Sequence, residues 1–314
     1  MSKTKVLVCS GGTGSAFATA EAAFLNFKDC IILTICDINT KELVSSSVFA
    51  DDYIVAKSIH DKGYKDFIID LVNSKNIEIC IPFIDKDVLI FSELYSTSKF
   101  SRDVKLQIYN PEIVKICSDK LLSYAWLKKN NIFTPETFLL QNESPKPGFI
   151  IKPIAGVGSI INDFNFTVLN EIADFDKYLI QEKCSNPEVT IDVFSNSDLD
   201  IFFYVCRERI ETKSGVCTKA RLFLDEELGH IAKELAEKLS LKFFCFQVMK
   251  LNGQWAVTDI NPRLGSGTPM CNAAGIDFFS AMLADFLGRN PEIYLKNLEK
   301  DIFVTRQYRN IPSL

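Results

Sequence analysis

The amino-acid sequence predicts an α/β fold whose first third is a doubly wound parallel sheet. The chain has 314 residues, which is enough for two or three subdomains. In the first third, short apolar runs alternate with helical patterns, and a glycine turn joins the first strand to the first helix. This alternation is typical of βαβ units, which place functional groups at the carboxyl ends of their strands.

The elements expected in this first part follow one another closely along the chain. Strands are expected at residues 5–9, 30–36, 54–55 and 77–82, and helices at residues 15–25 and 64–73. The first helix is rich in alanine, which favours the helical state. A parallel sheet covered by helices on both faces is therefore expected.

The composition is that of an ordinary globular protein, with 47% hydrophobic and 24% charged residues. Many of the 25 phenylalanines lie in strand-like runs, so we expect them to be packing material. The net charge of −5 gives no general attraction to nucleic acid. No apolar run is long enough to span a bilayer, and no signal-peptide core precedes the first strand, so we expect no membrane partner and a cytoplasmic location.

The ten cysteines predict neither a disulfide framework nor a zinc site. Most of them lie in apolar, strand-like surroundings, and no C-x-x-C pair occurs. The two histidines, His60 and His230, have no partner at zinc-binding spacing. We therefore expect small buried thiols in a reducing compartment.

The glycine turn at residues 10–14 is the first candidate site. Asp37 ends the second strand, and together the two features resemble a dinucleotide site in which Asp37 binds ribose hydroxyls. An NAD(P)-linked oxidoreductase is therefore one alternative function. The G-x-G-x-x-G/A register is incomplete because Phe17 occupies the last position, which favours a turn that only packs the helix on the sheet.

Asp85 lies just past the strand at 77–82, where a carboxylate can cap the next helix or touch a small ligand. Capping is the favoured interpretation. Further along, Ser118 is expected to cap a helix that carries Lys120 in its first turn. A lysine there opposes the helix dipole, so it is either solvated or bound to an anion such as a phosphate.

Residues 148–162 contain a second glycine loop. We expect strands at 149–152 and 160–162, joined by a loop at 155–159 whose backbone N–H groups can bind an anion, with Lys152 at its base. This is not a P-loop, because the lysine precedes the glycines and no helix follows. A plain flexible turn is the alternative.

Two further segments end in polar side chains. Residues 178–194 form strand, short loop and strand, with Gln181, Glu182 and Glu188 at the junction, where acidic groups suit ribose hydroxyls or an adenine amine. Asp259 and Asn261 are two apart in an extended apolar run, so both project from one face of a strand. Oxygen ligands of this kind suit a magnesium ion that holds nucleotide phosphates.

The order of these parts resembles the ATP-grasp superfamily, and within it the carbamoyl-phosphate-synthase-like ligases. The resemblance is carried by Lys120, IIKPIAGVGS, LIQEKCSNPEVTIDVF, CFQVMKL and TDINPRLGSGT, and the glycine turn with IPFIDKD looks like the domain that precedes them. It implies a Rossmann-like domain at 1–108 and a two-lobed α+β ATP-grasp domain at 109–314. The small lobe would span about 135–184 and the catalytic lobe about 185–314.

The resemblance also implies roles for individual residues. Contacts with ATP are expected from Lys120, Lys152, Gly156, Gly158, Ser159, Gln181, Glu182, Lys183, Cys184 and Glu188, of which residues 181–184 would line the adenine slot and Glu188 would bind the ribose. Magnesium, or manganese in its place, is expected at Gln247, Asp259 and Asn261. Arg263, Lys152 and Arg207 are expected to be catalytic. Many members carry Glu in place of Asp259; the shorter carboxylate still coordinates, and the resemblance leaves open whether the site holds one ion or two.

Arg207, Arg209, Lys213 and Lys219 form a basic cluster around Gly215. The resemblance implies that such residues meet the carboxylate or acyl-phosphate side, and Arg suits bidentate binding of a carboxylate. A solvated, charged hairpin is the alternative for these four residues.

The resemblance makes one geometric demand. Residues 243–251 and 254–260 look like a hairpin over Asn252 and Gly253, and a regular two-residue turn would set Gln247 opposite Thr258. Gln247 and Asp259 can share a metal only if the turn is longer or a β-bulge shifts the register. We predict such an irregularity.

The function implied is an ATP-dependent carboxylate–amine ligase. Its partners would be ATP, a small carboxylate and an amine, and a homodimer is compatible with this function. A non-catalytic ATP-binding sensor or scaffold with the same fold is the second alternative. Retention of the Lys, Asp, Asn and Arg residues favours the enzyme.

Overall fold

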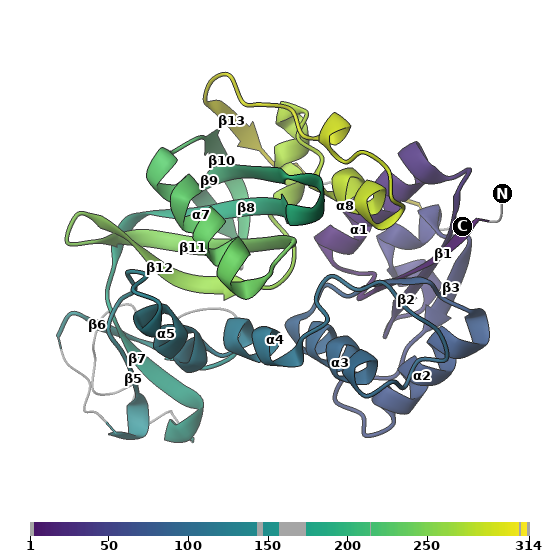
Figure 1. Cartoon of the computed structure of the whole chain (residues 1–314), viewed down its shortest axis with the longest axis horizontal. Coiled ribbons are helices and arrows are strands. Elements are labelled where there is room, and N and C mark those ends of the chain that lie inside the picture. Colours follow the sequence, from purple (N-terminus) through teal and green to yellow (C-terminus); the bar gives the residue numbers. More distant parts are fainter. Residues whose placement is uncertain (1–2, 143–146, 157–173, 214, 308, 313–314) are drawn as a thin grey trace.

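The computed structural model describes residues 3–142, 147–156, 174–213, 215–307 and 309–312, and it contains three sheets (Figure 1). A four-stranded sheet lies near both chain termini, a six-stranded sheet fills the centre, and a three-stranded sheet lies farthest from the termini. The predicted α/β fold, with its Rossmann-like first domain and two-lobed second part, is confirmed. Among the described residues, no helix is both long and apolar enough to cross a membrane.

The first sheet is parallel throughout, with strand order β3-β2-β1-β4. Its strands are β1 (Thr4–Cys9), β2 (Ile31–Asp37), β3 (Asp52–Val55) and β4 (Ile79–Ile81), and its helices are α1 (Gly14–Ala22), α2 (Tyr64–Lys75) and α3 (Asp85–Ser96). The side chains of successive β1 residues point to opposite faces of the sheet and pack in different hydrophobic cores. Val6 and Val8 share a core with α1, whereas Leu7 and Cys9 share one with α2 and α3, so both faces are covered.

The small lobe contains an antiparallel sheet in the order β5-β7-β6. Its strands are β5 (Thr137–Leu139), β6 (Phe149–Pro153) and β7 (Tyr178–Glu182), and helices α4 (Pro111–Ser118) and α5 (Lys120–Lys129) lead into it. The predicted strand at 160–162 and most of the predicted glycine loop lie outside the described residues. The described partner of β6 is β7, with Lys152 opposite Leu179.

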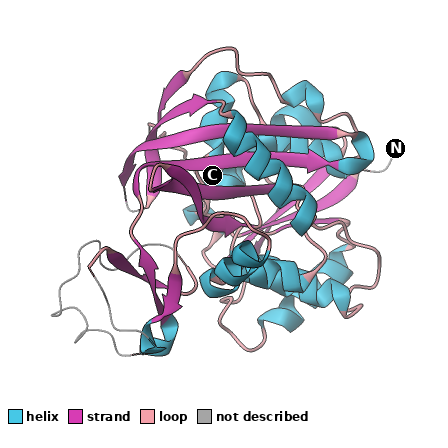
Figure 2. Cartoon of the chain, turned by 60° about the vertical axis from the view of Figure 1, so that its left-hand side comes forward, coloured by secondary structure: helices cyan, strands magenta, loops and turns pink. Residues whose placement is uncertain are grey.

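The large lobe is a six-stranded sheet in the order β12-β11-β8-β9-β10-β13 (Figure 2). Its elements are β8 (Ser185–Asn196), β9 (Ile201–Lys213), β10 (Val216–Phe223), α7 (Glu226–Leu239), β11 (Phe243–Leu251), β12 (Gln254–Asn261), α8 (Phe278–Phe286) and β13 (Ile302–Thr305). Helix α7 packs on one face, against Val189, Ile191 and Val193 of β8. Helix α8 packs on the other face and shares its core with α1 and the first sheet, which joins the two domains.

Short helical turns complete the described chain. A π-helical turn follows α1 at Ala23–Phe27, and 3₁₀ turns lie at Lys41–Leu43, Ser45–Phe49, Leu140–Asn142, Phe175–Lys177, Ser197–Leu199, Thr268–Ala274 and Glu292–Tyr294.

The hairpin of β11 and β12 has the predicted irregularity. Asn252 and Gly253 have φ angles of 51° and 83° and form a two-residue turn that pairs Leu251 with Gln254. The register then shifts between Val248 and Gln247, because Val248 pairs with Val257 but Gln247 pairs with Asp259. Thr258 is therefore the extra residue of a β-bulge, and the bulge brings Gln247 opposite Asp259.

Two expected helix caps are corrected. Asp119, not Ser118, caps α5, because its carboxylate accepts hydrogen bonds from the N–H groups of Leu121 and Leu122. Ser118 is instead the last residue of α4. Asp85 is the first residue of α3 and makes no capping hydrogen bond, since Ile84 is the N-cap.

The glycine turn after β1 is closed by Asp37. One carboxylate oxygen of Asp37 accepts a hydrogen bond from Gly12 N at 2.8 Å, and the other accepts from the backbone and side-chain nitrogens of Asn39, both at 2.9 Å. Gly11 is required for close packing, because a Cβ there would lie 2.5 Å from Ile35. Asp37 thus binds the turn itself, which supports the packing interpretation over a dinucleotide site.

We expect Asp37→Ala to lower the free energy of unfolding by about 2 kcal/mol, because Gly12 N and Asn39 N lose a charged acceptor. Urea denaturation measures this loss. Asp29→Ala, at an exposed position, is the control and should leave stability unchanged. ATP binding should be the same in both variants, and loss of nucleotide binding in Asp37→Ala alone would contradict a purely structural role.

Candidate nucleotide-binding site

A cleft of about 1070 Å³ lies between the three-stranded and the six-stranded sheets, and Asp85 of α3 also lines it. Its walls come from α3, the junction of α4 and α5, β6, β7, β8, β9, β11, β12 and the loop at 263–267. The cleft brings together the described site residues that the sequence predicted, namely Lys120, Lys152, Gly156, Gln181, Glu182, Lys183, Cys184, Glu188, Arg207, Gln247, Asp259, Asn261 and Arg263. Gly158 and Ser159 lie outside the described residues.

Two lysines enter the cleft, Lys120 from the start of α5 and Lys152 from β6, and both bind neutral oxygens. Lys120 Nζ donates to the carbonyl of Gly156 at 2.7 Å, and Lys152 Nζ donates to Gln181 Oε1 at 2.8 Å. Neither forms an ion pair with a described carboxylate at salt-bridge distance. Burial lowers the pKa of Lys152, although the charge of Asp259 opposes this effect. The cleft therefore holds positive charge that suits an anionic ligand.

Gln181, expected at the adenine slot, lines the cleft and makes two side-chain hydrogen bonds. Its side chain is only 3% exposed, and its Nε2 donates to Thr137 Oγ1 at 3.0 Å while its Oε1 holds Lys152. Gln181 thus positions the lysine. Cys184 lies in the cleft where β7 ends, and burial raises the pKa of its thiol to about 11, so it behaves as a neutral side chain.

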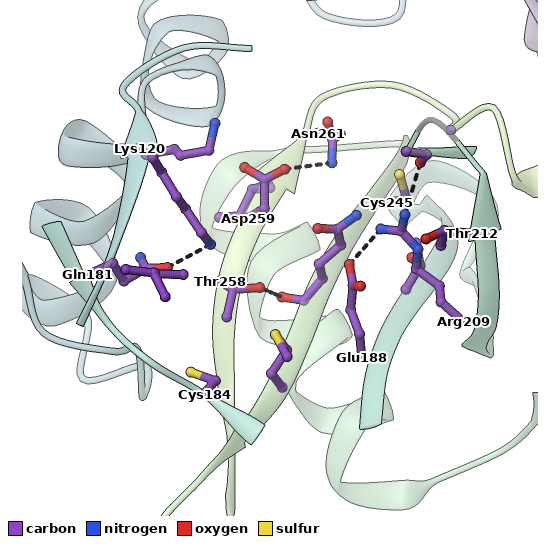
Figure 3. Close-up of a pocket in the computed structure, with 18 of the residues that line it drawn as sticks. Lys120, Gln181, Cys184, Glu188, Arg209, Thr212, Cys245, Thr258, Asp259 and Asn261 are labelled. Atoms are coloured by element: carbon purple, nitrogen blue, oxygen red, sulfur yellow. Dashed lines mark hydrogen bonds and ion pairs between the residues drawn. The ribbon is translucent and has the colours of Figure 1, made fainter. Parts of the chain in front are cut away.

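Glu188, expected at the ribose, forms an ion pair with Arg209 at 2.5 Å. Arg209 also donates to the carbonyl of Gly215 at 2.9 Å. Figure 3 shows this pair on the opposite side of the cleft from Gln181, with the end of β12 between them. Lys219 pairs with Glu211 at 2.8 Å, and neither Lys213 nor Lys219 lines the cleft, so these two lysines fit the alternative of a solvated hairpin.

Asp259, Asn261 and Gln247 supply the oxygen donors of the site. Asn261 Nδ2 lies 3.4 Å from Asp259 Oδ2, and the bulge pairs Gln247 with Asp259 (Figure 3). Burial raises the pKa of Asp259, while the charges of Lys120 and Lys152 oppose the rise. Among the described residues, no three His, Cys, Asp or Glu side chains gather as a metal site.

This donor set fits magnesium on its chemistry. One carboxylate and two amides are oxygen ligands, and magnesium bound with nucleotide phosphates takes only one or two protein groups. A flip of the Asn261 amide group, which exchanges its oxygen and nitrogen, turns the amide oxygen toward the ion. Because the set contains only one carboxylate, it suits a metal ion that nucleotide phosphates also bind better than a metal ion bound by protein side chains only.

Arg207 lines the cleft, and its guanidinium forms a buried ion pair with Asp192. Arg207 Nε and Nη2 lie 3.0 and 3.3 Å from the two carboxylate oxygens of Asp192, and the two residues are 2% and 0% exposed. Thr268 Oγ1 also donates to Asp192, at 2.6 Å. Burial lowers the pKa of Arg207, but the charge and hydrogen bonds of Asp192, together with the nearby thiols of Cys271 and Cys245, outweigh it and raise the pKa.

The sequence did not predict this contact of Arg207 with Asp192, and the catalytic role expected for Arg207 stays a prediction. A Cβ on Gly267 would lie 2.3 Å from Arg207 Nη1, so the guanidinium packs directly on the loop at 263–267. Asp192 and Thr268 complete this buried network and were not expected from the sequence. The available signal was an aspartate inside an apolar strand, which is rarely buried without a partner.

Arg263 pairs with Asp85, the residue expected to cap α3. Arg263 Nε lies 2.7 Å from Asp85 Oδ1, which links the loop after β12 to the first domain. The two atoms satisfy the distance of an ion pair, yet both are buried and neither meets the angular criteria of a hydrogen bond. The pair is therefore close but poorly aligned.

Comparison with known families agrees with this geometry. Residues 117–267 match the model of the ATP-grasp domain, and residues 6–107 match that of the PylC-like N-terminal domain. Together these matches cover most of the chain, which belongs to the ATP-grasp superfamily. No curated protein shows significant sequence similarity to the chain.

Solved structures share the fold over most of this chain. N5-carboxyaminoimidazole ribonucleotide synthetase from Thermotoga maritima superposes with a TM-score of 0.69 and 20% identity over 91% of this chain and 76% of its own. L-amino acid ligase from Bacillus licheniformis gives 0.71 and 13% over 93% and 76%. The biotin carboxylase domain of Hydrogenobacter thermophilus 2-oxoglutarate carboxylase gives 0.73 and 14% over 92% and 71%.

We expect Gly267→Ala to displace the guanidinium of Arg207 and lower the free energy of unfolding by about 1–3 kcal/mol, because Asp192 prevents Arg207 from moving freely. Thermal and urea denaturation measure the loss. Gly14→Ala is the matched control, since its Cβ would lie 3.7 Å from Ser266 O, an ordinary contact. Equal stability of the two variants would show that Arg207 has room to move.

The lowered pKa of Lys152 predicts a pH effect on nucleotide binding. Lys152 loses its charge at lower pH than an ordinary lysine, so ATP affinity should fall as pH rises through that lowered pKa. Phosphates favour the charged lysine, so binding in this range should take up to about one proton. Calorimetry in buffers of different ionisation enthalpy measures the uptake. Lys152→Arg stays charged and should abolish it; unchanged uptake would assign the proton to another group.

Proposed function

We propose that the protein is an ATP-dependent ligase that activates a carboxylate as an acyl phosphate and couples it to an amine. The observation that supports this proposal is the position of Lys120 and Lys152, which bring positive charge into the same cleft as Asp259 and Asn261. Such a cleft suits a nucleotide triphosphate with its metal. The biotin carboxylase domain of similar fold was solved with MgADP and bicarbonate, which is consistent with this use of the fold.

In this proposal, different residues of the cleft bind different parts of the nucleotide. Lys120 and Lys152 bind phosphate oxygens, and Gln181 holds Lys152 in place. The base lies between the end of β7 and β11, where Ile150 and Met249 are apolar walls. Glu188 accepts the ribose hydroxyls once its pair with Arg209 opens, or orients Arg209 if it does not.

Gln247, Asp259 and Asn261 are the residues that would hold magnesium. The ion supplies charge neutralisation to the phosphates when it is bound. The role of these three side chains is to fix the phosphates relative to Lys152 and Arg263. Asp259 must be ionised for that role, and the nearby charges of Lys120 and Lys152 favour its ionised form.

The reaction then needs no protein nucleophile. A carboxylate oxygen of the substrate attacks the γ-phosphorus, the bond from that phosphorus to the β–γ bridging oxygen breaks, and ADP leaves. The amine nitrogen next attacks the acyl carbon, the carbon–oxygen bond to phosphate breaks, and inorganic phosphate leaves as the nitrogen gives up a proton to solvent. The protein contributes positioning and neutralisation of charge.

Some parts of this function remain predictions from the sequence. They are the identity of the amine, the use of manganese, a cytoplasmic location, a homodimer and the absence of a nucleic-acid partner. The dimer has a parallel in the biotin carboxylase domain, which is described as a dimer.

The test is ADP release across a panel of carboxylates and amines in the presence of MgATP. We expect ADP release that requires a carboxylate, and a fall of about 100-fold or more in kcat/KM for Asp259→Ala. Asp52→Asn, which alters an ion pair with Lys75 outside the cleft, should retain turnover. ATP binding without ADP release for any pair of substrates would favour the sensor or scaffold instead.

A further inference from the structure

Thr190 lies on the floor of the cleft and was not expected in the site from the sequence. It belongs to β8, whose residues Val189, Ile191 and Val193 share a core with α7. Successive strand residues point to opposite faces of a sheet, so Thr190 points away from α7, and it lines the cleft. Its hydroxyl therefore belongs to the surface on which a ligand of the cleft lies.

The Thr190 hydroxyl is buried and makes no hydrogen bond. The residue is 3% exposed, and among the described residues its Oγ1 has no hydrogen-bond partner. A hydroxyl taken out of water normally has a partner, because the loss of its hydrogen bonds to water destabilises the protein. An unpaired hydroxyl on the surface of a cleft therefore indicates a contact that a ligand completes.

The other buried polar atoms of the cleft that make no hydrogen bond have different surroundings. Asp85 and Arg263 are partners of each other at ion-pair distance. Arg209 lacks a partner only at Nε, because its other two nitrogens donate to a carboxylate and to a carbonyl oxygen. Ser118 is only half-buried. Of the five described cleft residues with such an atom, only Thr190 is buried as a whole residue.

The neighbours of Thr190 across the sheet indicate which part of a nucleotide it meets. β8 lies between β11 and β9, and Thr190 is opposite Gln247 on one side and Arg207 on the other. Neighbouring strands are about 4.8 Å apart, so Gln247 is directly beside Thr190. Gln247 in turn pairs with Asp259, and both are proposed to hold the metal ion. Because that ion bridges the β- and γ-phosphates in phosphoryl transfer, Thr190 is next to these two phosphates.

The direction of the nucleotide favours the γ-phosphate of the two. The base is proposed to bind beside Met249, two residues from Gln247 on β11. The ribose is proposed to bind at Glu188, two residues from Thr190 on β8. Because β8 and β11 are antiparallel, Met249 and Glu188 lie on the same side of the pair formed by Gln247 and Thr190. The phosphates therefore extend toward Thr190, and the γ-phosphate extends farthest from the ribose.

We propose that the Thr190 hydroxyl donates a hydrogen bond to an oxygen of the γ-phosphate. The inference rests on the proposed ligase function and adds a residue that contacts the phosphoryl group in transfer. The hydroxyl keeps its proton and forms no covalent bond. Its role is to orient the γ-phosphate toward the attacking carboxylate. Burial of the hydroxyl destabilises the protein before the nucleotide binds, and the hydrogen bond to phosphate then offsets this effect.

Thr190→Val tests the proposal, because valine has nearly the shape of threonine and lacks the hydroxyl. Calorimetry compares the binding of MgADP with that of the magnesium complex of a non-hydrolysable ATP analogue that has an imido group between its β- and γ-phosphates. We expect Thr190→Val to weaken the analogue by about tenfold or more and to change MgADP by less than about twofold, because only the analogue carries the γ-phosphate. Thr190→Ser keeps the hydroxyl and should restore the affinity for the analogue.

The melting temperature of the same variant without nucleotide separates a ligand contact from a structural one. Removal of a buried hydroxyl that lacks a partner also removes its desolvation cost, so Thr190→Val should melt at the wild-type temperature or above it. A hydroxyl with a structural partner would give a lower melting temperature. Thr305→Val, exposed on β13 of the same sheet and outside the cleft, is the control and should change neither affinity.

Three results would overturn the inference. They are an unchanged affinity of Thr190→Val for the analogue, an equal weakening of the analogue and of MgADP, and a lower melting temperature of Thr190→Val without nucleotide. The ligase function fails separately, through absence of ADP release from MgATP with every carboxylate. In that event the difference between the two nucleotides still decides whether Thr190 contacts the γ-phosphate.

Discussion

Buried charge is the constraint on which this cleft depends. Taking an ion out of water is costly unless a partner compensates for it, and the cleft treats its cations in two ways. Arg207, Arg209 and Arg263 are each paired with a carboxylate of the chain. Lys120 and Lys152 bind neutral oxygens instead, so their charge is compensated only weakly by the protein. In the proposed function, an anionic ligand restores this balance, and the triphosphate binds at the two lysines.

A β-bulge sets the geometry opposite those lysines. Without the bulge at Thr258, the register set by the two-residue turn at Asn252 and Gly253 would continue along the hairpin and place Gln247 opposite Thr258. With it, Gln247 pairs with Asp259 at the end of β12, and Asn261 follows two residues later on the same edge of the cleft. The register shift of the backbone therefore brings the three residues that carry these oxygen donors together.

The sequence revealed what is local and left open what depends on packing. The alternation of strands and helices predicted the first sheet, and the ordered motifs predicted which residues share the cleft, because both signals lie within short stretches of chain. The partners of the arginines were missed. Arg207 and Asp192 lie on neighbouring strands, and Asp85 and Arg263 lie in different domains, so neither contact follows from spacing. The cap of α5 was missed by one residue because Ser118 and Asp119 are both good caps, and only the end of α4 decides between them.

The same distinction explains why the residues proposed to bind the nucleotide are readable in the sequence and the contacts with the first domain are not. The residues proposed for the phosphates come from the start of α5 and from strands and loops of the second domain, in an order fixed by the chain. The contact with the first domain is a junction: α8 packs against both α1 and the large sheet, and the loop at 263–267 reaches Asp85 on α3 while Arg207 packs against Gly267. The first domain therefore contributes Asp85 to the lining of the cleft.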